Sequence, residues 1–427
     1  MQLSSLTFLY AFLPLMLLTF HLAPRRWRSA VLAGANALYC AFGGPFALLL
    51  LIASILLGWR GCIVLRQNRG TAKGRVLLTC LVAAHLLALL ALRYGGFLAE
   101  ALKAPQPQWS APLGLSVYTL ALIGAEIDVF RGRAEPVGSL LAFAALAGCF
   151  PALAGGVVAR LPGEEQPRSW ETAADGARKA VCGLGKQVIL AGLLWEVAAR
   201  VSGEASVLHA YLYAGAVTLG SYHFLSGWAD LSSGLGQLFG LRLPDNFRYP
   251  LTAASPLEFQ DRWMMSVNGL LRCVLPGEAA VILVGLWLRP GWNGLLWGAL
   301  WGAALMAEKR FGTLRGPLGR VWVLALCTVG SVALMGDGPL GALGDLGALM
   351  GWGGVPLVSA EGLYQLKSAA VLLIAAALGA TPVPRRIYQW LSGQKWMALA
   401  EPVAAAALLA LVTGFLAEGV PPAWFTL

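Results

Sequence analysis

Residues 46–65 read FALLLLIASILLGWRGCIVL, a run of twenty residues that contains a single charge, Arg60. A stretch of about 20 predominantly apolar residues is long enough to cross the hydrocarbon core of a bilayer as a helix. Similar runs recur along the chain, in which 58% of the 427 residues are hydrophobic and only 12% are charged. Soluble globular domains carry roughly twice that charged fraction. The sequence therefore predicts an all-α polytopic membrane protein and excludes a soluble enzyme, a DNA-binding module and a disordered adaptor.

Outward from this run, breaks at Gly, Pro and charged residues divide the chain into on the order of 11 to 13 hydrophobic segments, some of them re-entrant. Residues 109–127 and 140–158 are interrupted by Pro and Gly, so they are expected to be buried in protein or to line a cavity. We expect one membrane-embedded domain over residues 1–427. The other apolar stretches, of which 30–42 is short for a full crossing, are 4–22, 30–42, 46–65, 76–92, 180–201, 208–239, 259–275, 279–288, 295–309, 322–335, 364–380 and 397–416.

The net charge of +10 is concentrated in short loops, above all at residues 25–28 and 60–75. Loops rich in Lys and Arg are cytoplasmic in multi-pass proteins and face anionic lipid. This pattern predicts a bacterial-type inner membrane protein with a periplasmic or extracellular N-terminus, whose partner is the lipid bilayer rather than nucleic acid. Residues 1–23 lack a basic start, so we expect a retained first span instead of a cleaved signal. The polar stretch 160–179 is expected to be a cytoplasmic loop with a surface helix.

Cysteine and phosphate-binding patterns point to no cofactor. The seven cysteines are scattered and form no C-x-x-C pair, so neither a disulfide framework nor a metal site is expected. The glycine-rich stretch 336–354 lacks the spacing of a phosphate-binding loop. We therefore expect no bound cofactor and no metal.

Three motifs in the middle of the chain carry a family resemblance. They read FLSGWAD at residues 224–230, LFGLRLPDNF at 238–247 and SPLEFQDRW at 255–263. They resemble the motifs F-S-G-Y-S-D, L-F-G-F-x-L-P-E-N-F and E-F-W-R-R-W-H of the membrane-bound O-acyltransferase family, specifically its alginate O-acetyltransferase branch. Further pieces follow in family order: SSLTFL at 4–9, PLGLS at 112–116, IDVFRG at 127–132, FPALAG at 150–155 and TPVPRR at 381–386.

The resemblance implies a helical bundle around a tunnel through the membrane. Family members transfer an acyl group from a cytoplasmic donor, here acetyl-CoA should the chain be active, to a hydroxyl acceptor or a partner protein on the far side. A histidine in the tunnel serves as their base, because neutral imidazole accepts a hydroxyl proton near neutral pH. The expected partners are a periplasmic acetyltransferase or a polysaccharide-synthesis protein.

This sequence departs from the family at the histidines themselves. The R-W-H motif ends in Met264, the G-L-W-H-G motif has Leu288 in place of histidine, and the L-W-G-x-x-H motif ends in Trp301. None of these side chains exchanges a proton. The stretch between the first two motifs, residues 272–284, is also shorter than in the family, which removes part of the expected tunnel wall. The catalytic residue is therefore unknown.

Four histidines remain as substitutes: His21, His85, His209 and His223. His21 is expected at the interface, His85 in helix packing and His209 at the entry of a span. His223 is the substitute candidate, since Asp230 lies two helical turns on and shares its face. Two turns are about 10 Å along the axis, however, which is too far for a direct hydrogen bond.

Other polar and aromatic groups are candidates for lining the tunnel or holding it together. Asp230 needs a partner inside a bundle, and Arg262 is the expected one. Residues 245–248 are expected to cap a helix and fix a loop. The full set of tunnel or structural candidates is Ser226, Asp230, Arg262, Trp263, Trp287 and Asn293.

Three functional hypotheses follow. The first is a catalytically degenerate family member in a system that O-acetylates or exports an extracellular polysaccharide. The second is an active O-acyltransferase that uses a non-standard base. The third is a lipid or solute transporter. The acyl group, the acceptor, the partner and the oligomeric state do not follow from the sequence.

Overall fold

The computed structural model describes residues 3–109, 111–161, 164–165, 169–203, 206–314, 316–352 and 354–419. The chain divides into two compact units. Unit 1 comprises Met1–Ala180 and Leu231–Asp245, and unit 2 comprises Val181–Asp230 and Asn246–Thr426. The single-domain expectation stays a prediction. The described secondary structure is helical, as predicted, apart from one pair of two-residue strands.

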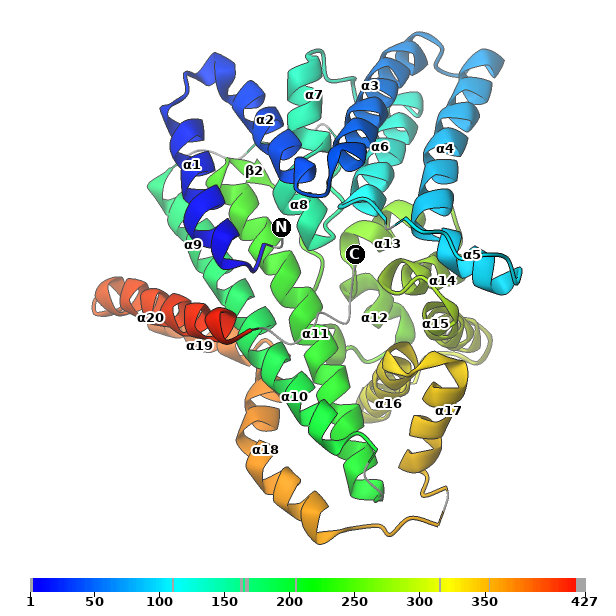
Figure 1. Ribbon diagram of the computed structural model, residues 1–427, viewed down its shortest axis with the longest axis vertical. Coiled ribbons are helices and arrows are strands. Elements are labelled where there is room, and N and C mark those ends of the chain that lie inside the picture. The colour runs from blue at the N-terminus through cyan, green and yellow to red at the C-terminus, as the bar shows by residue number, and fades with distance from the viewer. Residues whose placement is uncertain are drawn as a thin grey trace. The chain divides into compact units, whose positions relative to one another are not determined.

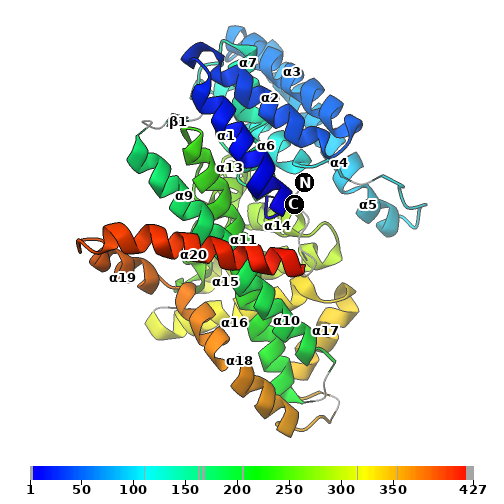
Figure 2. The ribbon, with the colours of Figure 1, turned by 60° about the vertical axis from the view of Figure 1, so that its left-hand side comes forward.

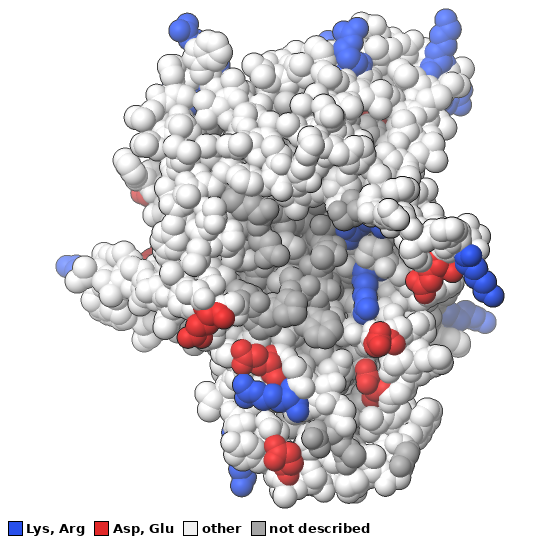
Figure 3. Space-filling view, viewed as in Figure 1, with Lys and Arg blue, Asp and Glu red and all other residues white. Residues whose placement is uncertain are grey.

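Six of the described helical segments are long and apolar enough to cross a membrane, which confirms a multi-pass α-helical membrane protein. On the face drawn in Figure 3, uncharged atoms cover most of the described surface and charged residues form small groups. The predicted number of 11 to 13 hydrophobic segments stays a prediction. The six segments are Pro45–Gln67, Ala72–Arg93, Trp170–Val201, Gly316–Met335, Ala360–Gly379 and Met397–Glu418.

Unit 1 is built around α6, whose residues from Leu115 to Val129 are all buried. Helices α3 and α4 pack against it, side by side in Figure 1. Gly114 starts α6 in the left-handed region at φ 71°, which explains the interruption predicted there. The elements are η1 (Phe8–Phe12), α1 (Leu13–Leu22), η2 (Arg25–Trp27), α2 (Arg28–Ala41), α3 (Pro45–Gln67), α4 (Ala72–Arg93), α5 (Gly95–Ala101), α6 (Leu115–Phe130), α7 (Leu140–Ala147), α8 (Phe150–Gly155), β1 (Glu164–Glu165), β2 (Leu241–Arg242) and most of α9 (Trp170–Leu184).

Two features hold the N-terminal part of unit 1 together. The rings of Phe8, Phe12, Tyr39 and Phe150 form one buried cluster with centroids 5.4–6.2 Å apart. Asn36 donates to the carbonyls of residues 144 and 145 and accepts from the Phe150 N–H at 2.9 Å. These buried bonds satisfy backbone groups at the break between α7 and α8, where no helix can.

Unit 2 contains the long middle helix α11 and the C-terminal half of the chain. Within it α14 and α15 form the closest hairpin, because a Cβ at Gly285 would lie 2.2 Å from the Gly294 carbonyl oxygen. Figure 2 shows α19 and α20 beside each other beyond α18. The elements are η3 (Gly185–Leu190), α10 (Ala191–Val201), α11 (Val207–Leu238), η4 (Pro250–Thr252), α12 (Pro256–Arg262), α13 (Met265–Leu271), α14 (Gly277–Leu288), α15 (Trp292–Phe311), α16 (Gly316–Met335), α17 (Gly338–Leu349), α18 (Ala360–Gly379), α19 (Val383–Leu391) and α20 (Met397–Glu418).

Two expected segments differ in the structure. The expected span 259–275 is wrong, because the left-handed Met264 (φ 46°) divides it into the short helices α12 and α13. The expected surface helix within 160–179 is also wrong as a separate element. Helix begins at Trp170 and continues without a break to Val201, since η3 and α10 follow α9 directly. Residues 162–163 and 166–168 of that stretch lie outside the described residues.

Candidate functional site

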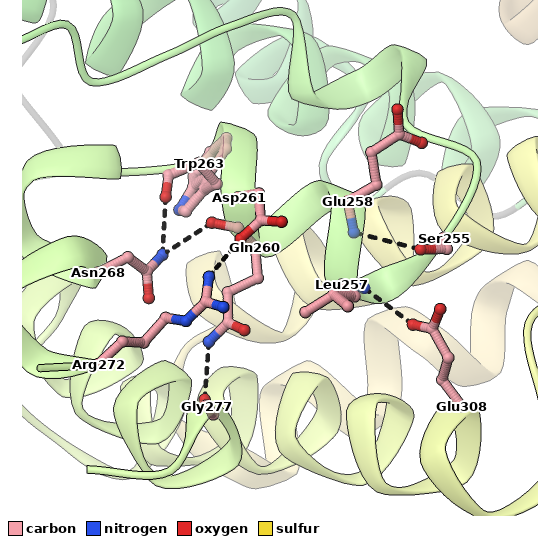
Figure 4. A network of polar contacts seen from close by, with 10 residues as sticks. All are labelled: Ser255, Leu257, Glu258, Gln260, Asp261, Trp263, Asn268, Arg272, Gly277 and Glu308. Atoms are coloured by element: carbon pink, nitrogen blue, oxygen red, sulfur yellow. Dashed lines mark hydrogen bonds and ion pairs between the residues drawn. The ribbon is translucent and has the colours of Figure 1, made fainter.

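The segment Arg262–Trp263–Met264 is held by a network of hydrogen bonds that joins α12, α13 and α14 (Figure 4). Ser255 caps α12 by accepting from the Glu258 N–H at 3.2 Å. The Asn268 amide donates to the Trp263 carbonyl at 2.7 Å and to the Gln260 carbonyl at 3.2 Å. Gln260 in turn donates to the Gly277 carbonyl at 2.7 Å. The bend at Trp263 and Met264 is therefore fixed by side-chain bonds to carbonyls that the helices leave free.

Asn246 completes this arrangement from the preceding loop. Its backbone carbonyl accepts from Met265 N–H at 2.9 Å and its Oδ1 accepts from Ser266 N–H at 3.0 Å. These bonds cap the first turn of α13, where orphan N–H groups point outward. The expectation that residues 245–248 include a helix cap is confirmed for Asn246.

The predicted pairing of Asp230 with Arg262 is wrong. Arg262 bonds the carboxylate of Glu258, one turn back on α12, and donates to Thr252 Oγ1 at 3.1 Å. Asp230 instead bonds Lys186, whose Nζ lies 2.7 Å from Asp230 Oδ2. Sequence reasoning missed Lys186 because it sought a partner only among the motif residues.

The glycine of the FLSGWAD motif explains why this lysine is the partner. A Cβ at Gly227 would lie 2.6 Å from the Gly183 carbonyl oxygen, so α11 can approach the end of α9 this closely only with glycine there. Lys186 follows within the π-helical η3, a local helix form that is frequent at functional sites. Ser226 is buried one turn before Asp230. The motif thus brings two helices together and places an ion pair on them.

His223 does not form a dyad with Asp230, which is already paired with Lys186. The His223 side chain is fully buried, and its Nε2–H donates to the Ala376 carbonyl on α18 at 2.8 Å. Its Nδ1 is buried and has no hydrogen-bond partner among the described residues. A Cβ at Gly379 would lie 3.1 Å from Cε1, so the ring packs closely on α18. His223 is therefore a helix-packing residue with one free acceptor nitrogen.

The other three histidines all have hydrogen-bond partners. In unit 1, His21 is exposed with Nε2 at 3.2 Å from the Leu238 carbonyl, and the buried His85 lies 3.1 Å from Glu126. In unit 2, His209 Nδ1 lies 2.7 Å from Ser206 Oγ. Each contact ties neighbouring segments together. Among the described residues, no three His, Cys, Asp or Glu side chains gather closely enough to hold a metal ion.

The three positions where the family has histidine are all filled by buried side chains. Met264, Leu288 and Trp301 are each 1% exposed. Trp301 stacks on Phe259 with centroids 3.8 Å apart and rings inclined by 7°. The small cavity here has a volume of only about 10 Å³, which is room for about one water. Its lining includes Thr218, Ser221, Phe259, Trp263, Trp297, Trp301 and Cys327.

Two residues of the α14–α15 hairpin clamp the end of α16. Arg289, which follows Leu288, donates to the Leu334 and Gly336 carbonyls. Asn293 donates to the carbonyls of Ala333 at 2.7 Å and Gly336 at 3.1 Å. The buried Trp287 lies on the same α14–α15 hairpin. These bonds tie the hairpin to the connection between α16 and α17.

Unit 1 contains a separate polar hollow of about 860 Å³. Cationic and anionic side chains alternate on its wall, with Arg160 at 3.5 Å from Asp128 and Lys179 at 2.8 Å from Asp245. Its volume lies in the range of small-molecule sites. The charged lining residues are Asp128, Arg133, Glu135, Arg160, Lys179, Arg242 and Asp245.

Comparison with known proteins identifies relatives along most of the chain. It is 28% identical over 347 residues to a probable alginate O-acetylase of Azotobacter vinelandii, covering 72% of this chain and 69% of the relative. It is 28% identical over 351 residues to a probable alginate O-acetylase of Pseudomonas aeruginosa, covering 74% and 68%. A peptidoglycan O-acetyltransferase of Helicobacter pylori is 28% identical over 106 residues, or 21% and 20% of the two chains. No family model matches the chain.

Proposed function

Since this chain is a relative of the alginate O-acetyltransferase branch of the membrane-bound O-acyltransferase family, we propose that it serves a system that O-acetylates a cell-surface polysaccharide, without histidine-based catalysis of its own. Its place would be the bacterial inner membrane, beside a periplasmic acetyltransferase or a polysaccharide-synthesis protein. The names of the relatives support the pathway, and the three replaced histidines support the lack of catalysis.

The observation that carries the proposal is the packing around Trp301. A tunnel needs room for an acyl group and a base beside it, and this region has neither. The cavity beside the stacked Trp301 and Phe259 rings has a volume of about 10 Å³, and Met264 and Leu288 are buried. General-base assistance is typically worth about 10²- to 10⁴-fold, so its loss removes useful turnover without forbidding a slow background reaction.

The first experiment measures release of free thiol from acetyl-CoA by the purified full-length protein, with a polysaccharide acceptor present. We expect no release above a protein-free control. We also expect Leu288→His to remain inactive, because a base misplaced by about 1 Å can lose around 10²-fold. Turnover on the order of 1 per second or more, a typical enzyme rate, would overturn the proposal.

The second experiment tests whether the protein takes part in polysaccharide O-acetylation at all. A deletion strain should produce polysaccharide with less O-acetyl ester, and the wild-type gene should restore the ester content. His223→Ala should restore it to the extent that the variant protein accumulates in the membrane. Unchanged ester content in the deletion strain would remove the chain from the pathway and favour a transporter.

An active acyltransferase is the second candidate, and one observation favours it. His223 keeps a free acceptor nitrogen, as a base needs. Under this alternative, His223→Ala would abolish thiol release while the folded protein remained.

The orientation of the protein in the membrane is proposed from its loops rich in Lys and Arg. The α1–α2 and α3–α4 connections lie at the same end of unit 1 in Figure 1. Arg69 donates to the Ala134 carbonyl, so the loop around 131–135 lies at that end too. That end would be cytoplasmic by its excess of Lys and Arg. A cysteine at position 2 should then react with an impermeant thiol reagent in intact cells. Reaction only after lysis would reverse the orientation.

A further inference from the structure

The short helix α19 lies between two membrane spans. Helices α18 (Ala360–Gly379) and α20 (Met397–Glu418) are both long and apolar enough to cross a bilayer. The linker 380–396 that contains α19 must therefore run along one membrane face. None of the described residues of α19 is fully buried, so the helix lies at the surface of the protein.

The two sides of α19 have opposite character. Val383, Ile387 and Trp390 recur at the i, i+4 and i+7 spacing of one helical face and are 40%, 52% and 72% exposed. Arg385 and Gln389 lie on the opposite face, also exposed. A row of apolar side chains this exposed is unfavourable in water, at about 25 cal/mol per Å² of apolar surface.

The charge of the linker is purely basic. Residues 380–396 contain Arg385, Arg386 and Lys395 and no acidic residue. Trp390 lies between the two arginines and Lys395 in the sequence, and Trp396 follows Lys395. Tryptophan is enriched where the hydrocarbon core of a bilayer meets the headgroups. Tyr388 also donates to Glu401 on α20 at 3.0 Å, which fixes the rotation of α19 against that span.

We propose that α19 is an interfacial helix that binds anionic phospholipid headgroups in the cytoplasmic leaflet. Val383, Ile387 and Trp390 enter the boundary between headgroups and acyl chains, and Arg385, Arg386 and Lys395 contact lipid phosphates. The combination of an apolar face and basic residues is the pattern of helices that lie in the plane of a membrane. The alternative is a protein partner that covers the same face, and the first test distinguishes it from lipid.

The first test uses benzoyl-phenylalanine introduced at position 390 or at position 389 of the full-length protein. Each protein is reconstituted in vesicles of phosphatidylglycerol and phosphatidylcholine, irradiated and analysed for lipid adducts. Adducts at 390, and at least several-fold fewer at 389, are expected from the two faces. Equal yields at both positions, or no lipid adduct at 390, would overturn the proposal. The same irradiation in cells would show a protein adduct at 390 if a partner covers this face.

The second test measures the preference for phosphatidylglycerol over phosphatidylcholine by native mass spectrometry of lipid-bound protein. Each basic residue near an anionic surface contributes about a fivefold preference, equivalent to about 1 kcal/mol. Arg385→Gln/Arg386→Gln should therefore lose at least about fivefold. Arg25→Gln/Arg26→Gln is the matched control, since it removes two exposed charges from η2, which carries no such apolar row. An equal loss of phosphatidylglycerol preference in both variants would show that the preference depends on net charge alone. That result would contradict a binding site on α19.

Discussion

Lys186 and Asp230 form an ion pair within the helical part of unit 2, with Nζ and Oδ2 2.7 Å apart and both side chains about 30% exposed or less. The segments that carry them, η3 and α11, contain no other Lys, Arg, Asp or Glu. Ionisable groups at such positions almost always pair with one another or face a water-filled space. The pair therefore joins the η3 segment to α11 at the level of the FLSGWAD motif.

Removing one member of this pair should destabilise the protein more than removing both. Asp230→Asn leaves Lys186 charged and unpartnered, at a cost on the order of 3 kcal/mol, the lower end for a buried pair. Lys186→Met/Asp230→Leu should cost less than the sum of its single variants. The measurement is unfolding of the detergent-solubilised protein. Strict additivity of the two single effects would contradict the coupling.

A surface pair provides the control for that experiment. Asp175 bonds Arg178 on α9, and its side chain is 61% exposed. Asp175→Asn should change stability by about 1 kcal/mol or less, since exposed ion pairs contribute little. A comparable loss in this variant would show a general response to lost charge.

The sequence predicted the fold class because apolar runs of span length have one physical solution in a bilayer. It predicted the breaks at Gly114 and near Pro151 for the same reason, since these residues interrupt helical hydrogen bonding. It did not predict α17, because the segment GPLGALGDLGAL has poor intrinsic helix propensity. That helix packs against α16 and α15, and this tertiary contact is invisible in the local pattern.

The candidate site was predicted less well than the fold. The replaced histidine positions in the motifs are all buried. The partner of Asp230 was missed because it depends on how closely Gly227 allows two helices to approach. Asn293 was predicted as a tunnel-lining or structural residue, but its partners, the Ala333 and Gly336 carbonyls about 40 residues away in sequence, were not predicted. Contacts between distant segments carry no local sequence signal.

Trp301 should be the most sensitive position of the aromatic cluster. Trp301→Ala removes a fully buried ring that stacks on Phe259, and large-to-small changes of this kind cost about 3 to 5 kcal/mol. Trp301→Phe should lose less, because stacking is kept. Trp322→Ala, at a position 42% exposed on α16, is the control and should have a small effect. Equal losses from the Trp301 and Trp322 alanine variants would contradict the packing argument.

Asn293 should be irreplaceable by its acidic isostere. The Asn293 amide donates to the Ala333 and Gly336 carbonyls, which a carboxylate cannot do. Asn293→Ala leaves buried carbonyls without this donor, at a cost of about 1 to 3 kcal/mol. Asn293→Asp should cost more than Asn293→Ala, since it adds a buried charge facing carbonyl oxygens. Denaturant unfolding of the solubilised proteins measures both, and the reverse order would contradict the clamp.

Glu135, in the loop after α6, should titrate at a lower pH than an ordinary glutamate. The hydrogen bond from Arg69 lowers the pKa of the Glu135 carboxyl, and the charge of Arg66 lowers it further. Arg69 also donates to the Val129 and Ala134 carbonyls, both at 2.7 Å, so its guanidinium is held in place. Because the folded-state pKa is depressed, any stabilisation by this contact is complete above the unfolded-state pKa and is lost as pH falls through the folded one.

The two arginines allow a matched test of this cause. Both Arg66→Gln and Arg69→Gln remove one positive charge next to Glu135, but only Arg69 is fixed by further bonds to backbone carbonyls. The pKa of Glu135, followed by ¹³C NMR of selectively labelled protein, should therefore rise more in Arg69→Gln than in Arg66→Gln. Glu135→Gln identifies the resonance. A larger rise in Arg66→Gln would show that Arg66 sets the pKa of Glu135, and that the fixed guanidinium of Arg69 only shapes the loop.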